Sequence, residues 1–546
     1  MKRKAVAAVL TAVMVASMFT GCGSDNGSSS AKSASAASAA SAANDTVDED
    51  GKVNGIMYQE GLPLVDEGDY TFSIFCDDSS ESGEFIMLDE FKKQTNVDVD
   101  LKIYPYETAT ERLNLDLNSG DYADVIGGWT LSDNAILTYG VNQGVFIPLE
   151  DYFEKYCPNI SAILDLPGVR EKMTAPDGHI YTIPYVCTDT TVGYSPYINT
   201  KWLENVGMSM PTTTDEFEAV LKAFKEQDAN GNGDASDEIP FSTDPNNKHI
   251  EAMAGYFGLP MNKLGIAIQN EKVVYGGVSD TYREFLSWFH KLYAEGLVDV
   301  ELYTQDSSTW EGKGNQDLYG VSIAYGSNEF TGIPAAEERG DFDSMPVLNT
   351  DKDGIWLRDT EGFSVYRTQA VYANKAEHPE IICRWFDNAF ALENGIGCNR
   401  GPVGVIVNKE DDGYHAIDTT TLSEEDQEKY SWGNLWPQSL PKYLPVDFEF
   451  VEEHPMYDEK KATEEAYEAN LTKEIIPSYW IDLDKIDTFS DTNTAIKDFF
   501  EQQQAQFVCG ELDIDNDADW QAYVDGMYSL GLEDWVATQG IEEIAK

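Results

Sequence analysis

The sequence predicts an α/β protein built on a parallel sheet that is covered by helices. The main observation is an alternation of strand and helix patterns between residues 70 and 126. Such alternation is typical of parallel sheets, because two parallel neighbours need a long crossover connection between them. The second observation is size: 546 residues, of which 42% are hydrophobic, are enough for about two to four domains with sizeable cores.

Each element of this run has its own signal. In chain order the predicted strand, helix, strand, helix and strand are residues 70–75, 84–94, 96–104, 110–118 and 124–126. The strands alternate or are wholly apolar, the helices have apolar residues at helical spacing, Pro105 ends the middle strand and Gly120 closes the second helix. Because ligands bind at the carboxyl ends of parallel strands, Trp129, just after the third strand, is a candidate binding residue.

The amino terminus predicts export. Lys2, Arg3 and Lys4 precede residues 5–19, an uncharged apolar stretch that is shorter than the ~20 residues of a membrane span and is typical of a secretory signal. It ends in Phe19-Thr-Gly-Cys22, which resembles a bacterial lipobox, so residues 1–21 are interpreted as a lipoprotein signal peptide and Cys22 as the lipidated, palmitate-bearing residue. An ordinary signal peptide that happens to end near a cysteine is the alternative.

The acidic composition argues against a nucleic-acid partner. The chain has 97 acidic and 37 basic side chains, a formal net charge of −60. Removing residues 1–21 takes away three cations and no acids, which leaves −63. A charge of this size repels phosphate backbones, so we expect no nucleic-acid partner.

Residues 22–67 are predicted to be the lipidated cysteine and a flexible tether. Residues 23–43 contain eight Ser and eight Ala, and the chain stays polar and acidic to about Asn54. Such a composition cannot bury a core. An anchor followed by a tether predicts a protein that works at the outer face of the cell membrane.

The other cysteines do not indicate a disulfide scaffold or a thiolate metal site. They are scattered, and no C-x-x-C pair occurs. We expect most of them to be buried and free. They are Cys76, Cys157, Cys187, Cys383, Cys398 and Cys509.

A loop at residues 228–240 predicts a structural calcium site. Oxygen-bearing side chains occupy alternate positions, Gly231 and Gly233 allow tight wrapping, and hard oxygen ligands suit Ca²⁺. Ile239 stands where an EF-hand has its bidentate Glu, so two earlier acids would close the ligand shell. The predicted ligands are Asp228, Asn230, Asn232, Asp234, Asp237 and Glu238. An Asx-rich turn without metal is the alternative, and a second acidic run at 513–519 is interpreted as helix capping.

Several segments together resemble a known family. They are the lipobox and tether, Asp177-Gly-His-Ile-Tyr-Thr-Ile-Pro-Tyr185, residues 193–203, 211–217, 230–240 and 520–532. They are similar to the bacterial extracellular solute-binding proteins, family 1, of ABC importers, and within these to the large lipoprotein subgroup of Gram-positive bacteria. The resemblance spans about residues 68–540. Some members bind Ca²⁺ in the corresponding loop, which here is about one residue longer.

The resemblance implies a two-lobed periplasmic-binding-protein type II fold, with the ligand in a cleft between α/β lobes. We place the crossing segments that join the lobes at residues 183–194, 320–325 and 362–366. Lobe one then comprises residues 68–186 and 320–365. Lobe two comprises residues 187–319 and 366–546.

The implied function is capture of a carbohydrate, expected to be an oligosaccharide, by hinge closure, and its delivery to the membrane subunits of an ABC permease by a monomeric protein. Aromatic faces suit the C–H faces of a sugar, and polar side chains suit its hydroxyls. The candidate ligand residues are Trp129, Tyr185, Ser327, Asn328, Trp356, Arg358, Trp432 and Trp436. Core packing is the alternative for each Trp.

Two other function classes stay open: a surface-anchored hydrolase acting on glycans, and a peptide-binding or adhesin-type lipoprotein. The motifs G-x-S-x-G, H-E-x-x-H and G-x-x-x-x-G-K are absent, and the six His form no recognisable constellation. A glycosidase needs only two placed carboxylates, which an acidic chain always offers. We predict a binding protein with no catalytic residues.

Overall fold

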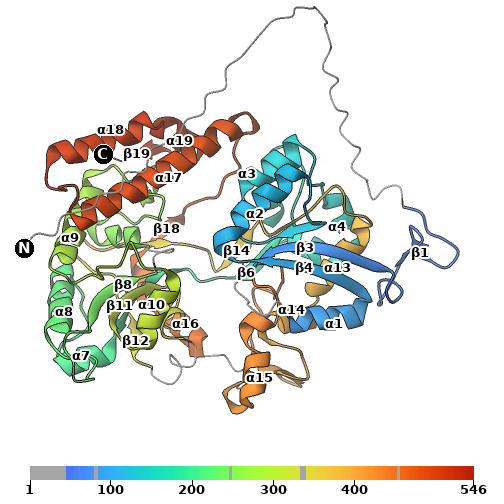
Figure 1. The fold of residues 1–546 in the computed structure, drawn as a ribbon, viewed down its shortest axis with the longest axis horizontal. Coiled ribbons are helices and arrows are strands. Elements are labelled where there is room, and N and C mark those ends of the chain that lie inside the picture. Colours follow the sequence, from blue (N-terminus) through green and yellow to red (C-terminus); the bar gives the residue numbers. More distant parts are fainter. Residues whose placement is uncertain are drawn as a thin grey trace, which may run out of the picture. The chain divides into compact units, whose positions relative to one another are not determined.

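The computed structural model describes residues 45–78, 84–244, 249–332, 340–417, 419–451 and 455–545. The predicted signal peptide and the lipidation site Cys22 lie outside these ranges. All of the elements below belong to one compact unit, residues 39–546. Figure 1 labels them along the chain.

The first sheet confirms the predicted run of strands and helices. Its strand order is β15-β5-β3-β4, with β3 parallel to β4 and β5, and β15 antiparallel to β5. The strands are β3 (Tyr70–Asp77), β4 (Val97–Tyr104), β5 (Val125–Gly127) and β15 (Ala370–Tyr372). The helices α1 (Ile86–Thr95) and α2 (Tyr106–Ser119) connect the three parallel strands, and Gly120 ends α2 in the left-handed conformation.

Further helices build the core around this sheet (Figure 1). They are α3 (Asp133–Ala135), the π-helix η2 (Ile136–Asn142), α4 (Glu150–Tyr156), α5 (Pro158–Leu164), α6 (Val169–Met173), α13 (Pro379–Ala389) and α14 (Leu392–Arg400). The indole of Trp385 on α13 packs edge-on against the rings of Phe72 and Phe91. The chain then forms the hairpin β16 (Val407–Glu410) and β17 (Gly413–Ala416), η4 (Thr419–Thr421), α15 (Glu424–Lys429) and η5 (Trp432–Asn434).

The second sheet has the order β12-β7-β11-β8. Its strands are β7 (Ser195–Asn199), β8 (Ile239–Thr243), β11 (Tyr319–Ala324) and β12 (Phe342–Ser344). The helical segments of this region are α7 (Thr200–Val206), α8 (Thr214–Glu226), η3 (Ile250–Phe257), α9 (Asp280–Ala294), α10 (Ser307–Asn315) and α11 (Asn328–Thr331). Thr213 caps α8: its hydroxyl accepts the N–H of Glu216 at 3.2 Å, which satisfies a free donor of the first turn.

Smaller sheets and a carboxyl-terminal helical segment complete the second core. The strands are β9 (Ile266–Gln269), β10 (Lys272–Tyr275) and β19 (Glu543–Ile544) in one sheet, and β13 (Trp356–Arg358) and β18 (Leu471–Ile475) in another. The helices are α16 (Pro455–Tyr467), η6 (Glu468–Asn470), η7 (Leu483–Lys485), α17 (Ile486–Cys509), α18 (Asp517–Ser529) and α19 (Leu532–Thr538). Asn516 caps α18, in agreement with the interpretation of the second acidic run.

Two of the predicted crossing segments lie side by side as strands. β6 (Tyr185–Thr188) pairs antiparallel with β14 (Phe363–Tyr366), and Tyr185 stands opposite Tyr366. Both strands connect segments of the first sheet to segments of the second. They form a two-stranded ribbon of their own.

The placement of the second predicted crossing is wrong. Residues 320–325 do not return to the first sheet, because β11 lies between β7 and β8 in the second. Conversely, β15 pairs with β5 and α13 packs on α4, although both belong to the range 366–546 that we predict for lobe two. A short buried run identifies a central strand but carries no information about which strands are its neighbours.

The predicted tether is also too long. Residues 45–67 contain the hairpin β1 (Lys52–Val53) and β2 (Met57–Tyr58), and Val53, Met57 and Leu64 are buried in the core of the first sheet. Asp45 forms an ion pair with Lys155 of α4 at 3.0 Å. The few apolar residues in this polar stretch are therefore sufficient to dock it.

Of the helices in the part of the chain that the structure describes, none combines the length and the apolar composition that crossing a bilayer requires.

Docking of residues 52–67 predicts a stability effect. Met57 is fully buried, so Met57→Ala should lower the free energy of unfolding by about 2–4 kcal/mol through lost burial and a cavity. Val47→Ala, in the same segment at 52% exposure, is the matched control and should change it by less than ~0.5 kcal/mol. Urea unfolding measures both, and equal effects of the two variants would contradict the docking.

Candidate functional site

An exposed tryptophan stands at the carboxyl end of the first sheet. Trp129 follows β5 and is 43% exposed. Its backbone N–H donates to Asp77 Oδ1 at 3.0 Å, and the N–H of Thr130 donates to Asp77 Oδ2 at 2.5 Å. Asp77 is the last residue of β3 and is fully buried, which raises the pKa of its carboxyl. Asp77, at the end of β3, therefore fixes the loop that follows the neighbouring strand β5.

Gly128 permits this arrangement because it has no Cβ. Its φ is +129°, a region that side chains rarely adopt, and a Cβ there would lie 2.5 Å from Asp77 Cγ. The carboxylate of Asp77 can then approach the backbone of the loop. Asp77, which the sequence analysis missed, could have been found by the strand-end rule that identified Trp129.

The crossing strands supply two more rings beside Trp129. The Trp129 ring is edge-on to Tyr366, with ring centroids 5.3 Å apart, and tilted against Tyr185 at 6.3 Å. Tyr185 and Tyr366 are 5.6 Å apart. The structure thus brings together two predicted ligand residues, Trp129 and Tyr185, and adds Tyr366, whose role no sequence signal indicated.

A hydrogen-bond path leads from these rings to the end of the second sheet. The hydroxyl of Tyr366 donates to Asp189 Oδ2 at 3.2 Å, and the hydroxyl of Tyr325 donates to Asp189 Oδ1 at 3.2 Å. Asp189 directly follows β6, and Tyr325 directly follows β11. Aromatic rings and a carboxylate therefore connect the carboxyl ends of β5 and β11, the kind of surface that binds a ligand with apolar faces and hydroxyl edges.

Ser327 and Asn328, two of the predicted ligand residues, lie just beyond β11. The backbone N–H and the hydroxyl of Ser327 donate to the Glu459 carboxylate at 2.9 and 2.6 Å. Ser327 is buried, whereas Asn328 begins α11 and is half-buried. The polar atoms of Ser327 therefore serve the protein itself, and Asn328 is the more accessible of the two.

Two of the predicted tryptophans belong to hydrophobic cores. Trp356 is 2% exposed and packs against Tyr256 and Tyr467, and Trp436 is fully buried against Trp385 and Phe91. A fully covered indole offers no face to a sugar, so the prediction that these two stack on a ligand is corrected. Both residues stand in loop-like stretches of sequence, from which their burial could not be predicted.

The last two candidates lie in different surroundings. Trp432 is 52% exposed in η5, with the buried Lys442 ammonium 5.4 Å from its ring centroid. Burial lowers the pKa of Lys442 to about 8. Arg358 donates through Nε to the carbonyl of Thr472 at 3.2 Å and lines a cavity of about 610 Å³ together with Asp133.

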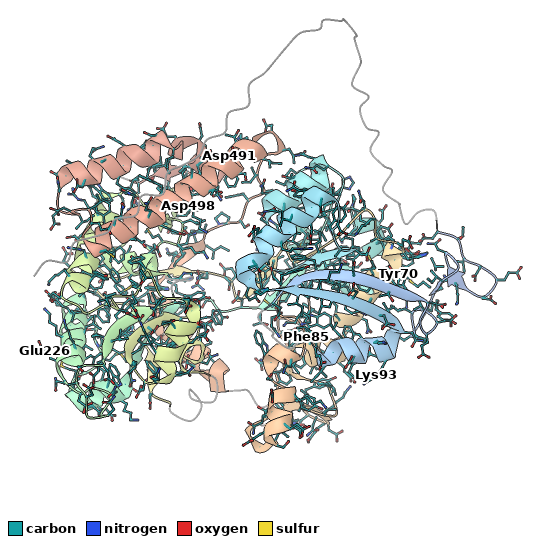
Figure 2. The ribbon with its side chains drawn as sticks, viewed as in Figure 1. Tyr70, Phe85, Lys93, Glu226, Asp491 and Asp498 are labelled. Atoms are coloured by element: carbon teal, nitrogen blue, oxygen red, sulfur yellow. The ribbon has the colours of Figure 1, made fainter. Side chains whose placement is uncertain are left out.

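The predicted calcium loop is held in its conformation by hydrogen bonds to its own side chains. It begins after Glu226, the last residue of α8 (Figure 2). Asp228 Oδ2 accepts the N–H of Gly233 at 3.0 Å, and Asn232 Oδ1 accepts the N–H of Asp234 at 2.7 Å. Asp237 accepts hydrogen bonds from the side-chain amide of Asn232 at 2.7 Å and from that of Asn230 at 3.3 Å. A cation would have to displace these amide contacts.

Two carboxylate oxygens of the loop have no hydrogen-bond partner among the described residues. They are Asp228 Oδ1 and Glu238 Oε2, and both are buried atoms. Burial raises the pKa of Glu238. Unsatisfied buried carboxylate oxygens lose the hydration that normally stabilises them, and a hard cation restores that stabilisation. The residues present therefore fit a Ca²⁺ ion.

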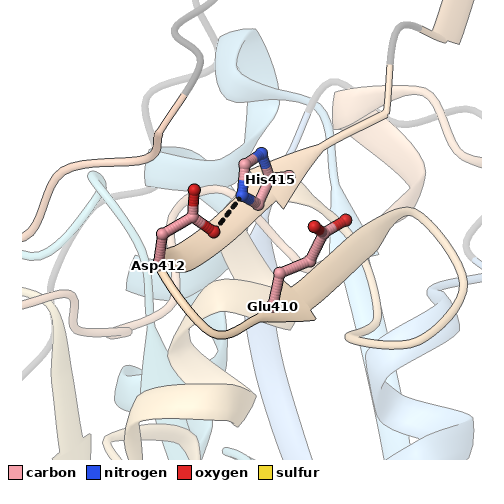
Figure 3. Close-up of side chains that lie close together, drawn as sticks. All are labelled: Glu410, Asp412 and His415. Atoms are coloured by element: carbon pink, nitrogen blue, oxygen red, sulfur yellow. Dashed lines mark hydrogen bonds and ion pairs between the residues drawn. The ribbon is translucent and has the colours of Figure 1, made fainter.

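A further group of possible metal ligands lies on the β16–β17 hairpin. The sequence analysis did not identify it. Single ligand atoms of Glu410, Asp412 and His415 lie within 4.8 Å of one another (Figure 3). His415 Nε2 and Asp412 Oδ1 are 2.9 Å apart, and this hydrogen bond lowers the pKa of Asp412. Both acids are exposed, and the hydrogen bond accounts for the contact between His415 and Asp412 without a metal.

Comparisons with known proteins point in one direction. A family model described as bacterial extracellular solute-binding protein matches residues 78–394. The fructooligosaccharide ABC transporter substrate-binding protein FusA of Streptococcus pneumoniae is 31% identical over 411 residues, 73% of this chain and 70% of that protein. FusA in complex with kestose has a TM-score of 0.76 and 26% identity, covering 86% of this chain and 98% of that chain.

Two further structures are similar. A FusA EF-hand mutant in complex with fructo-nystose has a TM-score of 0.72 and 26% identity, covering 86% of this chain and 98% of that chain. An HMO-binding solute-binding protein from Bifidobacterium longum infantis has a TM-score of 0.70 and 21% identity, covering 87% of this chain and 98% of that chain. The similarity confirms the predicted two-lobed α/β fold.

The close approach of Asp77 to Gly128 predicts a steric effect. Gly128→Ala should destabilise the protein by at least ~1 kcal/mol more than Gly120→Ala. Both glycines have positive φ, but the φ of Gly128 is +129° and that of Gly120 is +78°, and nothing lies within 4 Å of a Cβ at Gly120. The difference therefore combines the clash with Asp77 and the less accessible φ of Gly128. Chemical unfolding of the two variants provides the comparison, and equal losses would show that the Asp77 contact is unimportant.

Proposed function

Because the chain belongs to the bacterial extracellular solute-binding proteins, we propose that it captures an oligosaccharide outside the cell and delivers it to the transmembrane subunits of an ABC importer. The observation that carries the ligand class is the group of rings at the junction of the two sheets. Trp129 is exposed there, beside Tyr185 and Tyr366. Such rings match the C–H faces of sugar units, and the nearby Asp189 carboxylate and tyrosine hydroxyls match sugar hydroxyls.

Capture in this proposal needs binding energy and no covalent chemistry. The β6–β14 ribbon acts as the hinge, and a ligand that contacts both the Trp129 loop and the Tyr325 loop favours the closed arrangement over the open one. The relatives are substrate-binding proteins. The proposal is therefore a binding protein without turnover.

The relatives also suggest which oligosaccharide to test first. FusA is named for fructooligosaccharides and its structures hold kestose and fructo-nystose. We include short fructans with human-milk and plant oligosaccharides in one screen. Lipidation of Cys22 would hold the protein at the outer face of the cell membrane, close to the permease.

The loop at residues 228–238 is proposed to hold a structural Ca²⁺ ion. Asp228, Asn230, Asn232, Asp234, Asp237 and Glu238 supply the oxygen atoms. The two unpaired buried oxygens support the proposal, as does the description of a FusA variant as an EF-hand mutant. The ion would tie the end of α8 to the start of β8 and take no part in ligand chemistry.

The ligand proposal predicts an affinity loss on removal of one ring. Trp129→Ala should weaken binding of the oligosaccharide that stabilises the wild type by about tenfold or more (~1.4 kcal/mol), with little change in the melting temperature of the free protein. Tyr528→Ala on α18, at 42% exposure, is the control and should bind like the wild type. Calorimetric titration measures both.

Two outcomes would overturn the ligand proposal. If no oligosaccharide of the screen raises the melting temperature, the ligand class is wrong. If the purified protein releases shorter sugars from any of them, as judged by chromatography, the protein is a hydrolase.

The calcium proposal predicts a stability effect of chelation. EDTA should lower the melting temperature of the wild type, and Asp228→Ala should remove this difference, because an ion bound only to the folded state stabilises it by mass action. Asp515→Ala, in the other acidic run, should retain the full EDTA effect. Identical melting of the wild type with and without EDTA would refute the site.

A further inference from the structure

Gly193 in the first crossing segment is held from two sides by charged side chains. Its N–H donates to Asp359 Oδ2 at 2.7 Å, and its carbonyl accepts from Lys460 Nζ at 2.9 Å. A Cβ on Gly193 would lie 2.8 Å from Asp359 Oδ2. Asp359 lies in the segment that leads into β14, and Lys460 lies on α16. Three parts of the chain that are far apart in sequence therefore meet at one residue.

Lys460 also reaches the loop after β11. Its ammonium donates to the carbonyl of Tyr325 and lies 4.0 Å from the centroid of the Tyr325 ring. Lys460 is 5% exposed, so this charge is removed from water and depends on the two carbonyls that it binds. One buried cation thereby joins the crossing segment at Gly193 to the loop that begins at Tyr325.

The neighbouring acids of α16 make the same two connections. Glu459 accepts the N–H and the hydroxyl of Ser327, at 2.9 and 2.6 Å. Glu464, one turn beyond Lys460, accepts the N–H of Thr191 at 2.6 Å and its hydroxyl at 3.2 Å. Residues four apart lie on one face of a helix, so Lys460 and Glu464 present a common surface to the crossing segment.

We propose that Lys460 is a positioning residue which couples the loop at residues 325–328 to the crossing segment at residues 189–194. The inference rests on the proposed function, in which this loop contacts ligand and the crossing segment bends. A change at either carbonyl would leave a buried ammonium unpaired, so the two segments move together. Ligand contact at the loop is in this way transmitted to the hinge.

The coupling should depend on pH because burial lowers the pKa of Lys460 to about 8. The groups that face it are Glu459 and Glu464 on α16, Glu329 on α11, Asp189 and Asp359 on the crossing segments, and the ring of Tyr325. The acids favour the ammonium form, and burial opposes it. Since the charged form is lost as the pH rises through about 8, the hydrogen bonds to the two carbonyls lose the strength that the charge adds, and the coupling is weaker at pH 9.5 than at pH 7.

Hydrogen exchange tests the coupling without any ligand. In the wild type at pH 7 the amides of Thr191, Gly193, Tyr325 and Ser327 all donate to side-chain carboxylates. Lys460→Met keeps the apolar stem and removes the charge, and it should accelerate exchange about tenfold or more in both segments together. Lys461→Met, the exposed next residue, is the control and should leave exchange unchanged. Acceleration in one segment only, or in neither, would overturn the proposal.

Binding provides the second arm, with the sugar that the screen identifies, starting from kestose. Wild-type affinity should fall at least threefold between pH 7 and pH 9.5, whereas Lys460→Met should be weaker at pH 7 and flat across this range. A variant that loses affinity but retains the wild-type pH dependence would contradict the role of Lys460. If Lys460→Met does not fold, Lys460→Gln, which still donates to one carbonyl, replaces it. The affinity of this variant should likewise not change between pH 7 and pH 9.5. Absence of sugar binding by the wild type would refute the proposed function. The coupling would then be tested by the hydrogen-exchange experiment alone.

Discussion

The antiparallel pairing of β6 with β14 is the constraint on which the arrangement of the candidate site depends. The register places Tyr185 opposite Tyr366, so both rings stand at the same point between the two sheets. Trp129 reaches this point from the first sheet because Asp77 holds its loop, and Tyr325 reaches it from the second through Asp189. A slip of either strand by one residue would turn its tyrosine to the other face of the ribbon and separate the two rings.

Ionisable groups serve two distinct purposes in this acidic molecule. The large negative charge is mostly exposed, and we expect it to repel phosphate backbones. A few charged groups are withdrawn from water instead, and two of these have backbone partners. Asp77 binds two N–H groups after β5, and Lys460 binds two carbonyl groups beside the crossing segment. These two buried charges position loops, whereas the exposed charges form the acidic surface.

Local signals were sufficient for local structure. The predicted strands at 70–75 and 96–104 and the helix end at Gly120 are all present, because each depends on residues that are close together in the chain. The strand-end rule placed Trp129 correctly for the same reason. Trp356 and Trp436 show where such reasoning stops, since a loop position in sequence is compatible with either an exposed ring or a core ring.

The sequence by itself determined the α/β class, the acidic surface, the family resemblance and the oxygen-rich loop at residues 228–238. These are properties of composition and of short-range spacing, and they do not depend on distant contacts. Only the tertiary structure decided that β11 lies between β7 and β8, that residues 52–67 dock on the first core, and that Tyr366 and Lys460 belong beside the candidate site. Each of these is a contact between segments far apart in the chain, which is selected by the packing of the whole domain and not by any local pattern.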